Sequence, residues 1–342
     1  MNPFQGYEKM PDSLTKLGLS PQDMRLLERV EWVVTEKVHG ANFSFVFDGE
    51  RLGYAKRKEM LAWTDDFFAF QLVAERLDAA MMRLFDRIRE LHPYDQAVVY
   101  GELYGGHYPH PEVPADERVQ PIQTGIWYSP TVEFAAFDIA VERQGERTYL
   151  DFVEVMRLCE ASGVPCVKPL HIGKLNDCLF FNTRFDSKVP GSLGLPELKP
   201  NLVEGIVVKP ATNLMIPGPK TDIRPIFKIK NKEFAEEQFH EAQNWSYQHE
   251  GAPASERLMF LVPEVGRYVN ANRLQSVISK IGGLSGGGEE RKMQVQQALA
   301  ADALETFWEE NVGLREDLSD ADLRWLTERV EALAGQCMSV MP

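Results

Sequence analysis

The sequence predicts an α+β fold in which a larger antiparallel-sheet domain is followed by a small all-helical domain. Three observations predict this fold class. Residues 31–57 alternate apolar and polar side chains around a turn, residues 67–92 repeat apolar side chains with the period of a helix, and a Gly-Ala-Pro segment at 251–255 precedes a helical tail. We therefore expect one domain over residues 1–245 and a second over residues 250–342.

Size and composition are those of an ordinary globular protein. The chain has 342 residues, 44% of them hydrophobic, which is enough to form the core of a principal domain and of a smaller one. The N-terminus lacks the basic region and the apolar run of a signal peptide, and no stretch has the length of a membrane span. We expect a cytoplasmic, monomeric protein with no membrane partner.

The net charge of −14 argues against a surface that attracts nucleic acid everywhere, because phosphate backbones are usually met by clustered Lys and Arg. Net charge describes only the average field, however, and a local basic groove is compatible with it. Basic side chains recur beside the motifs described below, at Lys37, Lys56, Arg57, Lys58, Lys209, Lys228, Lys230 and Lys232. Lys58 and Lys232 are best explained as ordinary solvated charges.

The first domain begins with paired strands and continues with a long helix. In residues 31–57 an apolar run is followed by Phe alternating with polar residues, by the turn Asp48-Gly49 and by a returning strand. This pattern predicts a meander that holds Lys37 near a strand end. Residues 67–92 carry apolar side chains at helical spacing and contain no Pro, which predicts a helix.

Further strands and one helix complete the first domain. We expect strands at residues 96–100, 134–141, 203–208 and 226–229, and a helix at residues 152–162. The Pro-rich segment 107–130 predicts a long surface loop. Within it, Trp127 and Tyr128 fit either base stacking or burial beneath the loop, and His107 and His110 do not form a metal site without further ligands.

The chain after residue 250 predicts helices. Residues 299–308 carry apolar side chains at helical spacing, and Ser319 with Asp322 forms the start of a capped helix that we expect to end before Gly335. The glycine-rich run before them lacks the preceding strand and the Lys-Ser/Thr pair of a phosphate-binding loop. We interpret that run as a connection between helices.

The predicted helical domain is acidic. Residues 251–342 contain 9 Lys and Arg against 14 Asp and Glu. Any contact of this domain with nucleic acid must therefore come from a few placed cations, and Arg267, Arg273 and Lys280 are the candidates.

Six short segments follow one another in order across two-thirds of the chain. They are Thr35-Glu36-Lys37-Val38-His39-Gly40, Tyr54-Ala55-Lys56-Arg57, Tyr100-Gly101-Glu102-Leu103-Tyr104-Gly105, Phe137-Asp138-Ile139, Glu204-Gly205-Ile206-Val207-Val208-Lys209 and Phe227-Lys228-Ile229-Lys230. Each is short enough to arise by chance, but the ordered series is far more specific. The series resembles the covalent nucleotidyltransferases, and among them the RNA ligase 2 family of ATP-dependent polynucleotide ligases. The resemblance implies that the first domain is an antiparallel-sheet adenylyltransferase domain with an ATP-grasp-like ligase fold.

The resemblance implies that Lys37 is the nucleophile of a covalent adenylyl transfer. The lysine would attack the α-phosphorus of ATP, release pyrophosphate and hold AMP as a phosphoramidate. An ordinary lysine has a pKa of about 10.4, so the site needs other cations that favour the neutral amine. Lys228 and Lys230, two residues apart on a predicted strand, would supply that field from one face. With Glu204, these are the residues to which we assign catalysis.

The resemblance also assigns residues to the nucleotide and to a metal. Glu204 resembles the acid associated with metal and phosphate, and the metal is expected to be Mg²⁺ or Mn²⁺. Glu102 resembles the carboxylate that accepts from the ribose hydroxyls, and Phe137 resembles the ring that stacks on adenine. Lys209 falls on the strand face opposite to Glu204. The residues assigned to nucleotide binding in this way are Glu36, His39, Asn42, Arg57, Glu102, Phe137 and Lys209.

Two features separate this chain from DNA ligases and capping enzymes in the resemblance. Those enzymes usually carry Asp at the position of His39, and they append a β-barrel where this chain predicts helices. The resemblance therefore implies an ATP-dependent RNA ligase of RNA repair that joins 3′-hydroxyl and 5′-phosphate RNA ends through lysyl-AMP and adenylylated RNA, at nicks in duplex RNA. Two alternatives stay open. One is a DNA ligase or a capping-type nucleotidyltransferase, and the other is an inactive nucleotide- or nucleic-acid-binding protein on the same fold.

Overall fold

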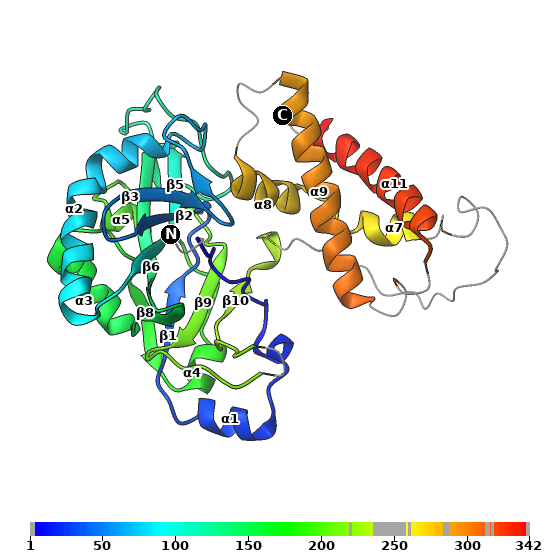
Figure 1. Cartoon of the computed structure of the whole chain (residues 1–342). Helices are drawn as coiled ribbons and strands as arrows, with labels where there is room; N and C mark the ends of the chain where they lie inside the picture. The colour runs from blue at the N-terminus through cyan, green and yellow to red at the C-terminus, as the bar shows by residue number, and fades with distance from the viewer. Residues whose placement is uncertain are drawn as a thin grey trace. The chain divides into compact units, whose positions relative to one another are not determined.

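The structure is a computed structural model that describes residues 4–218, 221–234, 258, 261–282, 288–311, 315 and 318–339. Its contacts divide the chain into two compact units, Met1–Glu233 and Phe234–Pro342 (Figure 1). The first unit consists mainly of β-strands and the second is helical in its described part. The predicted boundary between residues 245 and 250 lies outside the described residues and stays a prediction.

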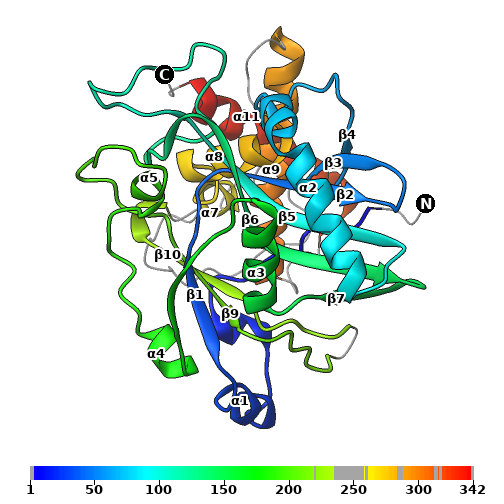
Figure 2. The same ribbon diagram turned by 90° about the vertical axis from the view of Figure 1, so that its left-hand side faces the viewer.

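The first unit contains two antiparallel sheets. The six-stranded sheet has the order β4-β3-β2-β5-β6-β7, with the bounds β4 Met60–Leu61, β3 Leu52–Lys56, β2 Ala41–Phe47, β5 Gln96–His107, β6 Ser129–Arg143 and β7 Glu146–Tyr149. The four-stranded sheet has the order β10-β9-β1-β8, with the bounds β10 Phe227–Lys230, β9 Gly205–Pro210, β1 Trp32–Glu36 and β8 Pro169–Gly173. Figure 2 shows β1 and β9 side by side below the strands of the larger sheet.

The prediction that residues 31–57 form one meander is wrong in its first half. β2 and β3 do form the expected hairpin, in which the Asp48 side chain accepts hydrogen bonds from two amides of the turn. β1, however, pairs with β8 and β9 in the other sheet. Its five residues are all buried, so an apolar run identified the strand without identifying its partners. The chain therefore crosses between the two sheets at residues 37–40.

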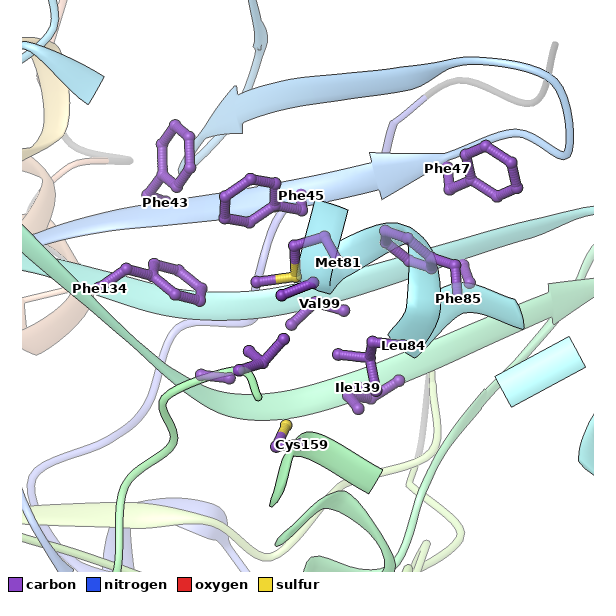
Figure 3. Close-up of a cluster of buried hydrophobic side chains, with 14 of the residues drawn as sticks. Phe43, Phe45, Phe47, Met81, Leu84, Phe85, Val99, Phe134, Ile139 and Cys159 are labelled. Atoms are coloured by element: carbon purple, nitrogen blue, oxygen red, sulfur yellow. The ribbon is translucent and has the colours of Figure 1, made fainter. Parts of the chain in front are cut away.

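The main core lies between the six-stranded sheet and its helices. α2 (Phe70–Leu91) falls within the predicted helical range and buries one stripe against the sheet. In Figure 3 the rings of Phe43 and Phe45 on β2 approach Phe134 on β6, and Leu84 of α2 lies near Ile139 of β6. α3 (Phe152–Ser162) matches the predicted helix and adds Cys159 to this core. This packing makes the larger sheet a rigid support.

The connection between β5 and β6 differs from the predicted surface loop. Both strands extend beyond their predicted ranges, so the connection spans residues 108–128, and several of its apolar side chains are buried. Tyr128 is 1% exposed and packs edge-on against Tyr104. Burial therefore removes Tyr128 from base stacking. Only isolated side chains of this segment reach the interior. They form no periodic apolar pattern among the Pro and polar residues, so the sequence did not predict their burial.

Short helices complete the first unit. They are η1 (Leu14–Leu17), α1 (Pro21–Leu27), α4 (Leu175–Leu179), α5 (Val189–Ser192) and η2 (Lys232–Phe234). α1 begins with a capping box, in which the Ser20 side chain accepts from the Asp23 amide and the Asp23 carboxylate accepts from Ser20. This start fixes the approach of the chain to β1.

The second unit contains four described helices around an apolar cluster. They are α7 (Leu261–Gly266), α8 (Ala271–Ile281), α9 (Gly288–Glu310) and α11 (Asp320–Ser339). The predicted cap of α11 is present, since Ser319 and Asp322 exchange hydrogen bonds. Gly335 does not end this helix, which continues to Ser339. Among the described helices, none combines the length and apolarity needed to cross a membrane.

The three cations proposed for RNA contact in the second unit are engaged with acids. Arg273 is buried and pairs with Asp302 at 2.8 Å, and Lys280 meets the other oxygen of the same carboxylate. Arg267 pairs with Glu264 at 2.6 Å. Arg273 is only 2% exposed, so it packs inside this unit and cannot reach RNA. The assignment of Arg273 to RNA contact is therefore wrong.

Candidate active site

The first motif forms the crossing between the two sheets. Lys37 follows β1 directly, and its backbone N–H donates to the carbonyl of Gly205 at 3.0 Å, which extends the pairing of β1 with β9. A Cβ at Gly40 would lie 1.9 Å from the carbonyl oxygen of Leu103, so only glycine fits where the chain enters β2. The Lys37 side chain is thus held at the junction of both sheets.

Glu204 is the centre of a charged cluster, which we call the Glu204 cluster and define as Glu204, Lys37, His39 and Lys230. Its carboxylate lies 2.6 Å from Lys37 Nζ, 3.1 Å from His39 Nδ1 and 3.2 Å from Lys230 Nζ. β9 and β10 bring these groups together, because Lys230 pairs with Gly205 and the Asn231 amide donates to the Glu204 carbonyl. The structure thus brings together four of the predicted site residues.

The electrostatics of the cluster favour an ionised carboxylate. Burial raises the pKa of Glu204, but the charges of Lys37, Lys230 and His39 outweigh it and hold this pKa well below its usual range. Glu204 is therefore a poor proton acceptor while all three partners are present. It can orient the Lys37 amine, and its oxygens are hard ligands of the kind that Mg²⁺ prefers.

Lys228 lies apart from these contacts. It precedes Lys230 by two residues on β10, as predicted, but its Nζ pairs with Asp12 Oδ1 at 3.2 Å. Its backbone N–H donates to the carbonyl of Pro11. The structure therefore joins Lys228 to the N-terminal segment and joins Lys230 to Glu204.

Asn42 and Glu102, each assigned separately to the nucleotide, form a cross-strand pair beside the first motif. They lie opposite each other on β2 and β5, so their side chains share a sheet face. Burial raises the pKa of Glu102 to about 7, an effect that Lys37 and Arg57 oppose and that the charge of Glu204 reinforces. The same fields couple this pair to the Glu204 cluster. Arg57, which follows β3 and is partly buried, contributes through this field.

Asn42 has a property that fits a bound ligand. Among the described residues, its buried Oδ1 has no hydrogen-bond partner. A buried amide oxygen without a partner costs free energy unless a ligand or water satisfies it. Within the same described ranges, no three His, Cys, Asp or Glu side chains gather closely enough to hold a metal ion by themselves. The donors present fit a hydrated divalent ion that is held mainly through nucleotide phosphates.

Phe137 occupies an irregular position of β6. The register with β5 shifts here, because Tyr100 pairs with Asp138 while Gly101 pairs with Ala136. The ring is partly buried and meets Tyr7 edge-on, with a centroid separation of 4.8 Å. The Tyr7 hydroxyl also donates to Asp138, so the bulge brings Phe137 and Asp138 to the same neighbour. Phe137 stays a candidate for adenine stacking on part of its ring.

Lys209 does not join Glu204. Its Nζ lies 3.1 Å from Asp138 Oδ1 and 2.8 Å from the carbonyl oxygen of Phe137. Asp138 also binds Arg224 at 2.6 Å and accepts from the Tyr7 hydroxyl at 2.7 Å. We call Asp138, Lys209, Arg224 and Tyr7 the Asp138 network. Strand alternation explains the separation, because residues 204 and 209 lie on opposite faces of β9.

The N-terminal segment is a part of the site that the sequence did not reveal. Tyr7 enters the Asp138 network, and Glu8 accepts from Arg224 at 2.8 Å. Gly6 passes so close to the backbone of Arg57 that a Cβ there would lie 1.9 Å from its carbonyl oxygen. Residues 4–13 have neither helical nor strand periodicity, so no pattern marked them. They bind both sheets through isolated polar side chains.

Glu36 was assigned to the nucleotide, but its carboxylate turns elsewhere. It accepts from Ser187 Oγ at 2.5 Å and from the Lys188 amide at 3.1 Å. Burial raises the pKa of Glu36, and these two hydrogen bonds partly offset the rise. Alternation along β1 places Glu36 on the face opposite to its neighbours Thr35 and Lys37. Its side chain therefore holds the segment before α5.

Two family models match the chain. The model described as RNA ligase matches residues 30–230, and the model described as T4 RNA ligase 2 C-terminal matches residues 252–336. The first match contains every residue of the Glu204 cluster and all predicted site residues, and it covers more than half of the chain. The first match ends just before the division into two units, and the second lies within the second unit.

Two curated relatives are RNA-editing ligases. RNA-editing ligase 1, mitochondrial, of Trypanosoma brucei brucei is 28% identical to this chain, over 89% of this chain and 74% of its own length. RNA-editing ligase 2, mitochondrial, of the same organism is 31% identical, over 52% of this chain and 48% of its own length. A Naegleria gruberi RNA ligase with PPi matches 68% of this chain with 15% identity and a TM-score of 0.43, and an archaeal ATP-dependent RNA ligase matches 98% with 14% identity and a TM-score of 0.40. The chain spans 57% and 64% of these two structures.

Proposed function

Because this chain belongs to the RNA ligase 2 family of ATP-dependent RNA ligases, we propose that it joins RNA 3′-hydroxyl and 5′-phosphate ends through AMP bound covalently to Lys37. The observation that carries the proposal is the contact of the Lys37 amine with Glu204 at 2.6 Å, beside Lys230. A lysine held by a buried carboxylate and flanked by a second cation has the setting that covalent catalysis by an amine requires.

In the first step the neutral Lys37 amine attacks the α-phosphorus of ATP. A phosphorus–nitrogen bond forms while the bond to the pyrophosphate oxygen breaks, and the attacking nitrogen gives up one of its two protons to solvent. Glu204 orients the amine, and Lys230, which pairs with the same carboxylate, supplies positive charge for the phosphate oxygens. Glu102 and Asn42 would hold the sugar and phosphate side of the nucleotide, and Phe137 the base.

Two further transfers complete the reaction. A 5′-phosphate oxygen of RNA attacks the adenylate and displaces Lys37, which yields a 5′-5′ linked adenylylated strand. The 3′-hydroxyl of a second strand then attacks the activated phosphate, forms the phosphodiester and releases AMP. In both transfers the chain supplies position and positive charge, and we assign that charge to Lys230 and Arg57.

We include ATP and a divalent cation as cofactors. A bound Mg²⁺ or Mn²⁺ neutralises phosphate charge and polarises the phosphorus for attack. Glu204 and the Oδ1 atom of Asn42 are the oxygen donors of the site that fit such an ion. We propose that the ion is held through phosphates and waters as well, because two protein donors leave most of its coordination positions to other ligands.

The proposed substrate is a nick in duplex RNA, sealed in the course of RNA repair by a monomeric enzyme. The match of residues 252–336 to the C-terminal model supports a helical unit that assists sealing. Duplex RNA is recognised by its shape and its 2′-hydroxyls, so a site of this kind does not require a strongly basic surface. This accommodates the net charge of −14.

Transfer of labelled nucleotide tests the proposal. The protein is incubated with Mg²⁺ and either ATP or GTP that carries label in the α-phosphate. We expect covalent, acid-labile label from ATP, none from GTP, and none in Lys37→Ala, while the exposed Lys58→Ala variant serves as the matched control and labels as the wild type does. Sealing of matched RNA and DNA nicks then identifies the polymer. Label from GTP alone would contradict the proposal in favour of capping chemistry, and no label at all would favour a binding protein.

A further inference from the structure

The first motif is held by side chains from two distant connections of the first unit. On one side, the His39 backbone N–H donates to the Tyr128 hydroxyl at 2.9 Å, and Gln123 Nε2 donates to the Gly40 carbonyl at 3.3 Å. On the other side, the Glu36 carboxylate accepts from Ser187 Oγ at 2.5 Å. None of these partners belongs to the six motifs.

The two connections are also joined to each other through Asn201. The Trp127 amide donates to Asn201 Oδ1 at 2.9 Å, and Asn201 Nδ2 donates to the Trp127 carbonyl at 2.8 Å. The Ser187 amide donates to the Asn201 carbonyl at 2.9 Å. A closed ring results, in which the hydrogen bonds join Glu36 to Ser187, Ser187 to Asn201, Asn201 to Trp127, and Tyr128 to His39. The peptide chain supplies the remaining links, from Trp127 to Tyr128 and from His39 through Lys37 back to Glu36.

Three members of the ring are buried, and the others are partly buried, so its bonds are largely sheltered from water. Tyr128 is 1% exposed, Asn201 is 3% exposed and Glu36 is 6% exposed. In such surroundings a missing partner leaves a polar group unsatisfied, and a complete ring favours one conformation. The bonds to the motif end on the Glu36 carboxylate directly before Lys37, and on the His39 amide and the Gly40 carbonyl shortly after it. They therefore set where the Lys37 amine points without touching the amine.

We propose that Tyr128 and Asn201 are positioning residues for lysine adenylylation. The inference rests on the proposed function, because it assigns these residues to the step in which Lys37 attacks ATP. A small displacement of the Lys37 amine from its line of attack on the α-phosphorus slows the transfer, whereas the binding of ATP is left intact. The sealing of RNA that already carries AMP does not use the Lys37 nucleophile. The ring should therefore matter most for the first step.

Removal of one hydroxyl tests this assignment. Tyr128→Phe keeps the ring and its packing against Tyr104 but removes the acceptor of the His39 amide. We expect the rate of lysyl-AMP formation at saturating ATP to fall about tenfold, the scale of one lost hydrogen bond. The ATP concentration for half-maximal rate and the sealing of chemically pre-adenylated nicked RNA should change less than about twofold. The matched control is Tyr94→Phe, the same change on a buried ring outside the six motifs whose hydroxyl donates to the Phe85 carbonyl, with wild-type rates in both assays.

Asn201→Asp is the second variant, because it keeps the oxygen that accepts from Trp127 and removes the amide that donates to it. It should show the same selective loss, and combined with Tyr128→Phe the losses should be less than multiplicative because both lie in one ring. Wild-type adduct formation in Tyr128→Phe would overturn the inference and leave the proposed function intact. So would an equal loss in adduct formation and in sealing, which indicates a general structural role. A wild-type protein that forms no adduct would overturn the proposed function and this inference with it.

Discussion

The Asp138 network and the Glu204 cluster are built from the same chemistry, a buried carboxylate that faces several cations. Asp138 is 0% exposed and Glu204 is 2% exposed. In both, burial raises the pKa of the carboxyl, and neighbouring cations lower it further than burial raises it. The charges alone would not tell which of the two takes part in a reaction.

The partners of the two carboxylates differ in their access to solvent. The side chains of Lys209 and Arg224 are 6% and 7% exposed, whereas those of Lys37 and Lys230 are 18% and 14% exposed. Closed ion pairs resist exchange because breaking them leaves a buried charge. Partly open ion pairs can trade a partner for a phosphate or a metal ion. The Asp138 network therefore stabilises the fold between the two sheets, and the Glu204 cluster is available for chemistry.

The largest expected difference concerns activity. Glu204→Gln keeps the shape of the side chain and removes its charge, so Lys37 and Lys230 lose their common partner. We expect lysyl-AMP formation to fall by a factor of about 10²–10³, the usual scale for one preorganised electrostatic group, with little change in the free energy of unfolding. Rapid-quench labelling and urea denaturation measure the two quantities. Retained labelling would contradict the role of this cluster.

The reciprocal change tests the other region. Asp138→Asn leaves Lys209 and Arg224 without their shared counter-charge, and we expect the free energy of unfolding to fall by about 3 kcal/mol, as for other broken buried pairs. Urea denaturation of the full chain, followed by fluorescence, measures this loss. The matched control is Glu233→Gln, in an ion pair with Arg184 whose side chains are 46% and 60% exposed. If Asp138→Asn were as stable as its control, the Asp138 network would not differ from the Glu204 cluster in stabilising the fold.

The smallest expected effect concerns pH. The pKa of Glu102 is raised to about 7, so this carboxyl is mostly protonated at pH 6 and mostly ionised at pH 8. Only the ionised form accepts from two ribose hydroxyls at once. ATP affinity, measured by titration calorimetry, should therefore rise by up to about tenfold from pH 6 to pH 8. Glu102→Gln should remove this dependence. A pH dependence that persists in the variant would assign it to another group.

Sequence reasoning was most successful where a motif specifies both a residue and its strand. Lys37, His39, Glu204 and Lys230 meet as their order predicts, since β9 and β10 carry the last two into contact with the first. Alternation also anticipated that Lys209 would lie apart from Glu204. Local periodicity is sufficient for such statements, because a strand fixes which of its side chains share a face.

The remaining features depend on contacts between distant segments. β1 and β2 read as one meander but belong to different sheets, and nothing in a buried apolar strand names its partner. Individual side-chain hydrogen bonds to residues far away in the sequence fix the roles of Tyr7, Tyr128 and Asn201. Such residues leave no periodic signal in a sequence. They became visible only from the positions of their atoms.

The site of AMP attachment tests the central claim most directly. The full chain is incubated with ATP and Mg²⁺, digested at mildly alkaline pH to preserve the phosphorus–nitrogen bond, and its peptides are sequenced by tandem mass spectrometry. AMP on Lys37 alone, absent after exposure to acid, is the predicted result. AMP on Lys228, Lys230 or any other residue, or a protein that binds ATP without forming an adduct, would contradict the account.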